Sequence, residues 1–208
     1  MVVCTNRYKY FSPTEKEGLL IVKMTFWETI IYFLTDNTYI SSMHIFLIGY
    51  MGSGKSYWAN KLAAYYGIPF MDIDDEITTQ EALSISEIFN TKGEAYFRKL
   101  EHTILQQIIS TKEKKIIACG GGTPCFYNNM KNMKSAGITI WLNIPTNILL
   151  QRLQLEQAKR PLLQDIDDIK VFIEKQLQKR EMYYKQADII IHNTNISIEE
   201  FVKTIQHV

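Results

Sequence analysis

The residues between Gly49 and Ser56 form a segment that could hold a phosphate group. The segment reads Gly-Tyr-Met-Gly-Ser-Gly-Lys-Ser and matches the pattern GxxxxGK(S/T), in which glycines let successive backbone N–H groups turn toward a phosphate. The ammonium group of Lys55 is expected to contact the β- and γ-phosphates, and the hydroxyl of Ser56 to bind Mg²⁺. An apolar stretch precedes the loop and a helical pattern follows it, which points a helix N-terminus at the anion. This context predicts binding of ATP or GTP rather than a chance glycine-rich turn, but many reactions share the loop.

Two aspartates, Asp72 and Asp74, lie at the end of the next short apolar stretch, which we expect to be the second strand. Their spacing of two residues on a strand would place both side chains on one side of the sheet. Ligands of parallel sheets bind beyond the carboxyl ends of the strands, where the phosphate loop also lies. We therefore predict that one carboxylate supports Mg²⁺ and the other accepts a proton from a substrate hydroxyl. The alternative is an acidic helix start at residues 74–76, which would stabilise a helix dipole.

Two arginines in separate helical segments could bind a second anion. Arg98 lies between Glu94 and Glu101, a spacing that also suits a surface ladder of ion pairs. Arg180 lies late in a long helical segment, where a cation also suits the end of the helix dipole. The planar fork of arginine forms paired hydrogen bonds with carboxylates, so both residues are candidates for binding a carboxylate-bearing acceptor.

A glycine triplet and a basic loop complete the candidate residues. The triplet follows an apolar strand and consists of Gly120, Gly121 and Gly122. The basic loop is Lys159-Arg160-Pro161, and we interpret it as a lid. Three glycines let the backbone approach a small ligand and donate N–H groups to it, whereas a flexible turn is the alternative. With Asp74 and the two arginines, these segments predict an acceptor that carries an anionic group and a hydroxyl to be phosphorylated.

The elements that would position these residues alternate between apolar strands and amphipathic helices. Short apolar stretches predict strands at 44–49, 69–73, 115–119, 138–142 and 187–191. Helices are predicted from the phosphate loop to Gly67, from a capping box at 84–87 to about Gly93, over 94–110, 145–155 and 166–186, and after Ser197. This alternation predicts an α/β fold, a parallel sheet with helices on both faces.

Composition excludes several classes of protein. The 208 residues are 46% hydrophobic and 22% charged, with a formal charge of +1, as expected for one globular domain with an appendage. A near-neutral chain has no global attraction for nucleic acid or acidic membranes. The most apolar stretch, 19–34, is interrupted by Lys23 and Glu28, whereas a membrane span needs about 20 mostly apolar residues. Three scattered cysteines favour a reduced, cytoplasmic protein.

The chain divides at about Met43, which could be a translation start. Residues 1–42 lack the periodicity of residues 43–208. We expect the first segment to be an extension that is poorly ordered or not translated, and that is dispensable for folding and activity.

Six segments of residues 43–208 resemble the shikimate kinase family and occur in the order typical of that family. They are FLIGYMGSGKS, FMDIDDEI, SISEIFNTKGEAYFRKLE, IIACGGGT, KRPLL and QKREMYYKQAD. The chain departs from the family's pattern at Tyr57 and Trp58, where we expect altered packing, and at Met182-Tyr183-Tyr184, close to Arg180.

The resemblance implies a three-layer P-loop kinase fold with a mobile lid and a five-stranded parallel sheet in the order 2-3-1-4-5. It implies a monomer that uses ATP and Mg²⁺ to phosphorylate the 3-hydroxyl of shikimate, in aromatic amino acid biosynthesis. The residues that would bind ATP are Gly49, Gly52, Ser53, Gly54, Lys55, Ser56, Tyr57 and Arg160, and Arg152 would lie beside the adenine. Shikimate would be bound by Asp74, Arg98, Gly120, Gly121, Gly122 and Arg180. Mg²⁺ would be held by Ser56 and, through water, by Asp72, and the catalytic residues would be Lys55, Asp74 and Arg160.

Two other functions are compatible with a phosphate loop. A related kinase would phosphorylate gluconate or a nucleoside monophosphate, but a nucleotide acceptor needs a base-stacking platform, and the sequence offers none beside the glycine triplet. A non-catalytic nucleotide-binding relative would be expected to lack Lys55, Asp74 or an acceptor arginine, and the chain has all of them.

Overall fold

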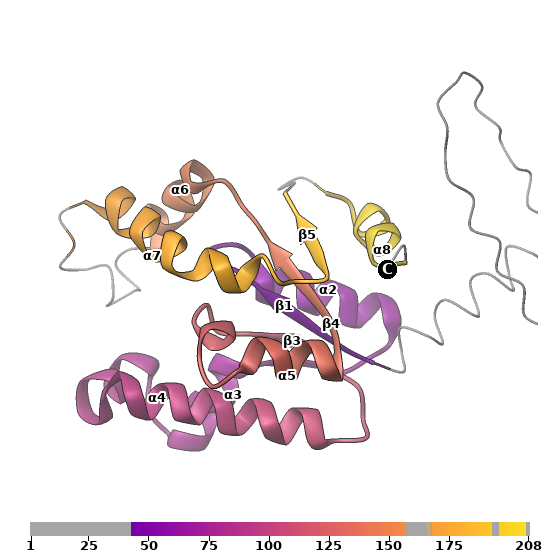
Figure 1. Ribbon diagram of the computed structural model, residues 1–208, viewed down its shortest axis with the longest axis horizontal. Coiled ribbons are helices and arrows are strands. Elements are labelled where there is room, and N and C mark those ends of the chain that lie inside the picture. The colour runs from indigo at the N-terminus through magenta and orange to yellow at the C-terminus, as the bar shows by residue number, and fades with distance from the viewer. Residues whose placement is uncertain (1–42, 157–165, 167, 193–195, 207–208) are drawn as a thin grey trace, which may run out of the picture.

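A five-stranded parallel sheet forms the centre of the computed structural model, which describes residues 43–156, 166, 168–192 and 196–206 (Figure 1). The strands lie in the order β2-β3-β1-β4-β5, which confirms the predicted sheet and its order. Their bounds are β1 His44–Ile48, β2 Phe70–Asp72, β3 Ile116–Ala118, β4 Gly137–Leu142 and β5 Ile189–Ile191. The helices are α2 Lys55–Tyr66, α3 Ile73–Glu81, α4 Ile85–Ser110, α5 Asn129–Ala136, α6 Thr146–Glu156, α7 Ile169–Tyr184 and α8 Ile198–Gln206, with a 3₁₀ turn η1 at Thr123–Cys125.

Strand β1 lies in the middle of the sheet and is buried along its whole length. Its side chains alternate between two apolar clusters: Ile45 and Leu47 pack with α2, α6 and α8, whereas Phe46 and Ile48 pack with α3, α4 and α5. Burial on both faces explains why the strand is a continuous apolar run rather than an alternating one. The result is the predicted arrangement of three layers, with the phosphate loop at the carboxyl end of the central strand.

Local sequence signals fix the starts of two helices. Helix α2 begins at Lys55, directly after Gly54, whose φ of 92° lies in the left-handed region. Helix α4 begins with a capping box, in which the Glu87 N–H donates to Ser84 Oγ at 3.2 Å and the Ser84 N–H donates to Glu87 Oε2 at 2.8 Å. Its helical backbone is interrupted at Gly93, where φ is 80° and ψ is 169°. The predicted boundary between a short and a long helical segment is therefore confirmed.

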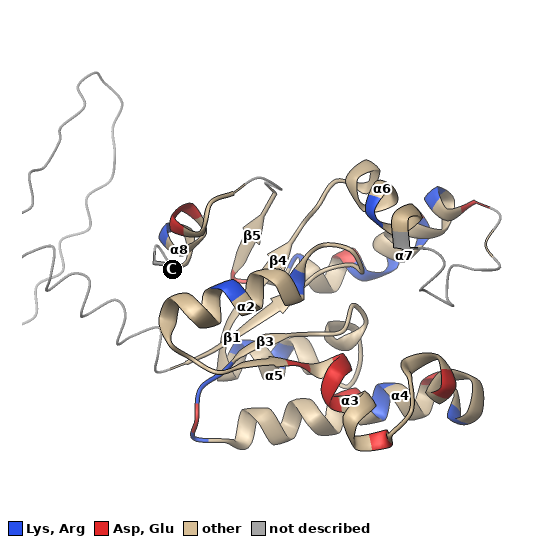
Figure 2. Cartoon of the chain, turned by 180° about the vertical axis from the view of Figure 1, so that it is seen from behind, with Lys and Arg blue, Asp and Glu red and all other residues tan. Residues whose placement is uncertain are grey.

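The placement of Asp74 on a strand was wrong. Strand β2 ends at Asp72, and Ile73 begins α3, so Asp74 lies in the first turn of a helix together with Asp75 and Glu76. Figure 2 shows these acidic residues at the start of α3. The Asp74 N–H donates to Asp72 Oδ1 at 3.0 Å, so Asp72 caps the helix. The acidic helix start was the correct interpretation of the local structure, and it does not conflict with a functional role for either carboxylate.

Two of the predictions concern residues that the structure does not describe. Residues 1–42 and the basic loop that contains Arg160 lie outside the described residues. Within the described ranges, no helix is both long and apolar enough to cross a membrane.

Candidate active site

The phosphate loop lines a cavity of about 820 Å³ at the carboxyl end of β1. Of the residues predicted to bind ATP, the cavity is lined by Gly52, Ser53, Gly54, Lys55, Ser56 and Tyr57. Gly49 does not line the cavity; a β-carbon there would lie 2.9 Å from the carbonyl oxygen of Leu142, so only glycine fits at the end of β1.

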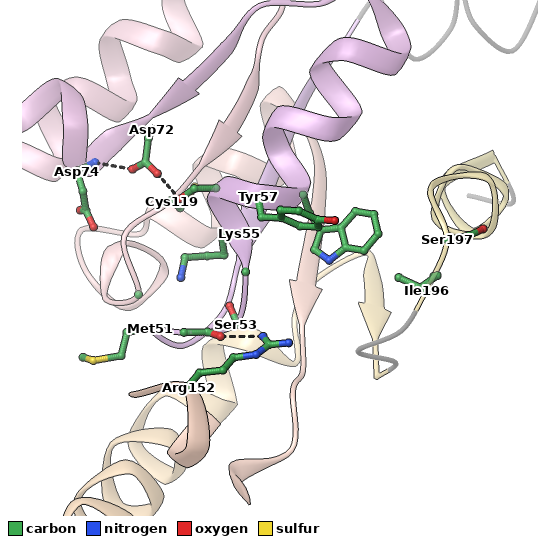
Figure 3. Close-up of a pocket in the computed structure, with 15 residues that line it drawn as sticks. Met51, Ser53, Lys55, Tyr57, Asp72, Asp74, Cys119, Arg152, Ile196 and Ser197 are labelled. Carbon is green, nitrogen blue, oxygen red and sulfur yellow. Dashed lines mark hydrogen bonds between the residues drawn. The ribbon is translucent and has the colours of Figure 1, made fainter. Parts of the chain in front are cut away.

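Lys55, Ser56 and Asp72 connect the loop to its surroundings. The Lys55 ammonium donates to the Tyr50 carbonyl at 3.0 Å, across the loop. The Ser56 hydroxyl donates to Asp72 Oδ2 at 2.5 Å, while Asp72 Oδ1 accepts the N–H of Asp74 (Figure 3). Mg²⁺ typically takes one or two protein oxygens together with phosphates and water. The Ser56 hydroxyl and the Asp72 carboxylate lie beside the phosphate loop and are ligands of this kind. The residues present therefore fit the predicted metal site.

Asp74 occupies the boundary between this cavity and a second one, because it lines both. Burial, followed by the negative charges of Asp72 and Glu101, raises the pKa of Asp74 to about 6, against the opposing effect of Lys55 and Arg98. A carboxylate with that pKa is mostly ionised at pH 7 and is a stronger base than an ordinary aspartate. Its position and basicity suit a general base.

The second cavity, of about 430 Å³, brings together all of the predicted acceptor residues. Its lining includes Asp74, Arg98, Gly120, Gly121, Gly122 and Arg180. Sequence reasoning missed Phe89 and Glu101, which also line it. The two cavities share Met51, Asp74 and Gly121, so a group bound in one faces a group bound in the other.

Arg98 takes part in the predicted ladder of ion pairs and also lines the acceptor cavity. It pairs with Glu94 at 3.0 Å and with Glu101 at 2.6 Å. Only the Glu94 end of the ladder is on the surface, because Arg98 is 9% exposed and Glu101 1% exposed. Glu101 also accepts a hydrogen bond from the Thr123 hydroxyl at 2.6 Å. These partners fix the guanidinium of Arg98 at the cavity wall, so the ion pairs are confirmed, whereas the binding of a carboxylate stays a prediction.

The glycine triplet is required by close packing rather than by flexibility. A β-carbon on Gly120 would lie 2.3 Å from Oε1 of Glu101, and one on Gly122 would lie 2.4 Å from Nη1 of Arg98. Both contacts are shorter than van der Waals separation, and both partners are held by buried ion pairs. Glycine at these positions therefore allows the Arg98–Glu101 pair to lie directly against the backbone that lines the acceptor cavity.

The far end of the larger cavity is lined by Arg152, Tyr57 and Ile196 (Figure 3). Arg152 Nη1 donates to the Gly52 carbonyl at 2.9 Å, so the guanidinium lies against the phosphate loop. Trp58 packs on Phe201 of α8 with ring centroids 4.9 Å apart, while the Tyr57 side chain is 57% exposed. The altered packing expected at these two positions, relative to the family, stays a prediction. Ile196 and Ser197 of this wall were not singled out for a nucleotide site from the sequence.

Comparisons with known proteins are consistent with this geometry. The family model described as shikimate kinase matches residues 51–208. The shikimate kinase of Azobacteroides pseudotrichonymphae is 38% identical over 163 residues, which cover 77% of this chain and 96% of the relative. The crystal structure of shikimate kinase from Bacteroides thetaiotaomicron superposes with a TM-score of 0.72 at 36% identity, covering 79% and 97% of the two chains. Shikimate kinase from Acinetobacter baumannii, solved in complex with shikimate, gives 0.73 at 29% identity, with 82% and 94% covered.

Proposed function

The chain belongs to the shikimate kinase family, and on that premise we propose how its residues transfer the γ-phosphoryl group of ATP to the 3-hydroxyl of shikimate. The observation that carries the proposal is the pair of adjoining cavities, which share Asp74 and Gly121. One cavity contains the phosphate loop, and the other contains two arginines suited to a carboxylate. Shikimate has one carboxylate and three ring hydroxyls, which matches the chemistry of the second cavity. The products are ADP and 3-phosphoshikimate.

Arg98 and Arg180 bind the carboxylate of shikimate, and the glycine triplet lines its ring. Asp74 then lies at the hydroxyl end of the acceptor, next to the phosphate loop. The Asp74 carboxylate takes the proton of the 3-hydroxyl as the hydroxyl oxygen forms a bond to the γ-phosphorus. The bond from that phosphorus to the bridging oxygen of ADP breaks in the same displacement.

The residues of the phosphate loop stabilise the charge that develops during this transfer. Lys55 and the backbone N–H groups of the loop contact the phosphates. Mg²⁺, when bound at Ser56 and Asp72, supplies positive charge to the β- and γ-phosphates. Arg160 is proposed to close over the γ-phosphate from the basic loop, and closure of a loop of this kind excludes water and suppresses ATP hydrolysis.

An assay of ADP release tests the assignment. Purified protein is mixed with ATP, Mg²⁺ and one acceptor: shikimate, gluconate or a nucleoside monophosphate. We expect rapid ADP release with shikimate and a rate near background with the others. Turnover of gluconate or a nucleotide in preference to shikimate would refute the proposed acceptor, and no turnover with any acceptor would favour a non-catalytic role.

We predict that Arg98→Ala and Arg180→Ala each raise the KM for shikimate by about 10- to 100-fold and leave the KM for ATP within about twofold. Each change removes a charged partner of the acceptor carboxylate, and such hydrogen bonds contribute about 1.5–3 kcal/mol. Steady-state kinetics with each substrate varied in turn measures both constants. The exposed neighbours Lys99 and Lys179 provide matched controls as Lys→Ala variants. An unchanged shikimate KM in a folded variant would leave that arginine with a structural role alone.

We also predict that a chain starting at Met43 folds and keeps the turnover of the 208-residue chain within about twofold. The described strands and helices, and both cavities, are built from residues after position 42. Circular dichroism and the ADP-release assay compare the two chains. If the shorter chain aggregates or loses most of its activity while the full chain works, residues 1–42 are a necessary part of the enzyme.

A further inference from the structure

The hydroxyl of Tyr184 connects the last turn of α7 to the glycine triplet. It donates a hydrogen bond to the Gly121 carbonyl at 2.5 Å. The Tyr184 side chain is fully buried, and its ring lies 5.6 Å from that of Trp141 on β4. Burial raises the pKa of Tyr184, so its hydroxyl stays protonated and remains a donor at any pH at which the enzyme works.

Arg180 lies one helical turn before Tyr184 on the same helix. The Arg180 guanidinium lies over the Tyr50 ring, 5.4 Å from its centroid, and Nη1 lies 3.1 Å from where a β-carbon on Gly121 would be. Arg180 also donates to Gln176 Oε1 at 3.3 Å, a long hydrogen bond. Gly121 therefore accepts the hydrogen bond of the Tyr184 hydroxyl and leaves room for the guanidinium of Arg180 beside it.

The two acceptor arginines are held in different ways. Arg98 is fixed by ion pairs to Glu94 and Glu101. Among the described residues, no carboxylate forms an ion pair with Arg180, so its position follows from where α7 lies on the triplet. The Tyr184–Gly121 hydrogen bond joins the helix to the middle residue of the triplet, in the wall between the two cavities.

We propose that Tyr184 is a positioning residue for shikimate binding: its hydroxyl holds α7 in the register that directs Arg180 at the acceptor carboxylate. This inference rests on the proposed function. Tyr184 itself lines neither cavity. Its effect is therefore transmitted through Arg180 and the Gly121 backbone, and it falls on acceptor binding rather than on the phosphate loop.

The test is Tyr184→Phe, which removes the hydroxyl and keeps the ring. We expect the KM for shikimate to rise about 3- to 10-fold, as for the loss of one hydrogen bond, with the KM for ATP and kcat within about twofold. Tyr183→Phe makes the same change one residue earlier, outside the lining of both cavities, and should leave both constants unaltered. A shikimate KM that stays at the wild-type value in folded Tyr184→Phe would overturn the proposal.

A double-mutant cycle separates positioning from a general effect on folding. In the Arg180→Ala background, Tyr184→Phe should raise the shikimate KM by less than twofold, because the side chain that it positions is already gone. Full additivity of the two changes would overturn the proposal. Circular dichroism checks that each variant is folded. Tyr184→Met provides a second variant without the hydroxyl. If neither Tyr184 variant folds, the residue is structural and the proposal fails. Turnover of shikimate by the wild type tests the underlying function separately in the same assay.

Discussion

Replacing Lys55 with methionine is expected to lower kcat by about 10³-fold or more while the protein stays folded. The Lys55 ammonium lies on the phosphate loop and reaches across it to the Tyr50 carbonyl, in the cavity that Asp72 and Asp74 also line. A positive charge placed at a transferring phosphoryl group contributes an effect of this size in related reactions. Methionine keeps most of the length of the side chain and removes the charge. Turnover at saturating ATP and shikimate, measured together with circular dichroism, checks the expectation.

Lys61→Met is the matched control. Lys61 lies on the same helix, is exposed, and contacts the Tyr57 ring with Nζ 4.8 Å from the centroid. Loss of its charge should change kcat by less than about twofold. A folded Lys55→Met protein with near-normal turnover would contradict the proposed role of the phosphate loop.

Asp74→Asn is expected to lower kcat by about 10²- to 10⁴-fold, the range for a positioned general base. Asparagine has the same shape but cannot accept the hydroxyl proton. ATP affinity, measured by calorimetry, should change little because the proposed partner of Asp74 is the acceptor. The exposed neighbour Asp75 provides the control variant Asp75→Asn. If the ATP affinity of Asp74→Asn falls while kcat does not, the roles of Asp72 and Asp74 have been exchanged.

The raised pKa of Asp74 makes both the activity and the stability of the enzyme depend on pH. With a pKa of about 6, the base is ionised above that pH, so wild-type kcat/KM should fall as the pH drops through 6. The folded-state pKa is raised above the ordinary value of 3.8, so the native state binds more protons than the unfolded state between about pH 4 and 6. Stability therefore falls as the pH rises through this interval. Asp74→Asn should melt at a higher temperature than the wild type at pH 7, and this difference should shrink toward pH 4.

The sheet and the phosphate loop could be predicted because their signals are local. A continuous apolar run such as residues 44–48 is typical of a strand buried on both faces, and the loop motif fixes its own glycines, lysine and serine. The placement of Asp74 failed because a spacing of two residues indicates one face only while the strand continues. Asp72 ends the strand by capping a helix. The sequence of this segment is compatible both with a continuing strand and with a helix start.

The missed residues of the site depend on contacts between distant segments. Glu101 is an ordinary acidic residue in a helical pattern, and its burial follows from contact with Arg98 and Thr123. The link from Tyr184 to Gly121 spans 63 residues and has no local signal. Helix α5 was not predicted either, since its eight residues are mostly polar and begin at an asparagine with a left-handed N-cap before them.

The interruption of α4 at Gly93 divides the helix into two parts, and both parts reach the acceptor cavity. Ile85, Phe89 and Asn90 before the break line the acceptor cavity, and so do Arg98 and Glu101 after it. The break depends on glycine, because φ of 80° with ψ of 169° is a conformation that residues with a β-carbon rarely adopt. The angle at which the two walls of the acceptor cavity meet is therefore set by a single backbone conformation at Gly93.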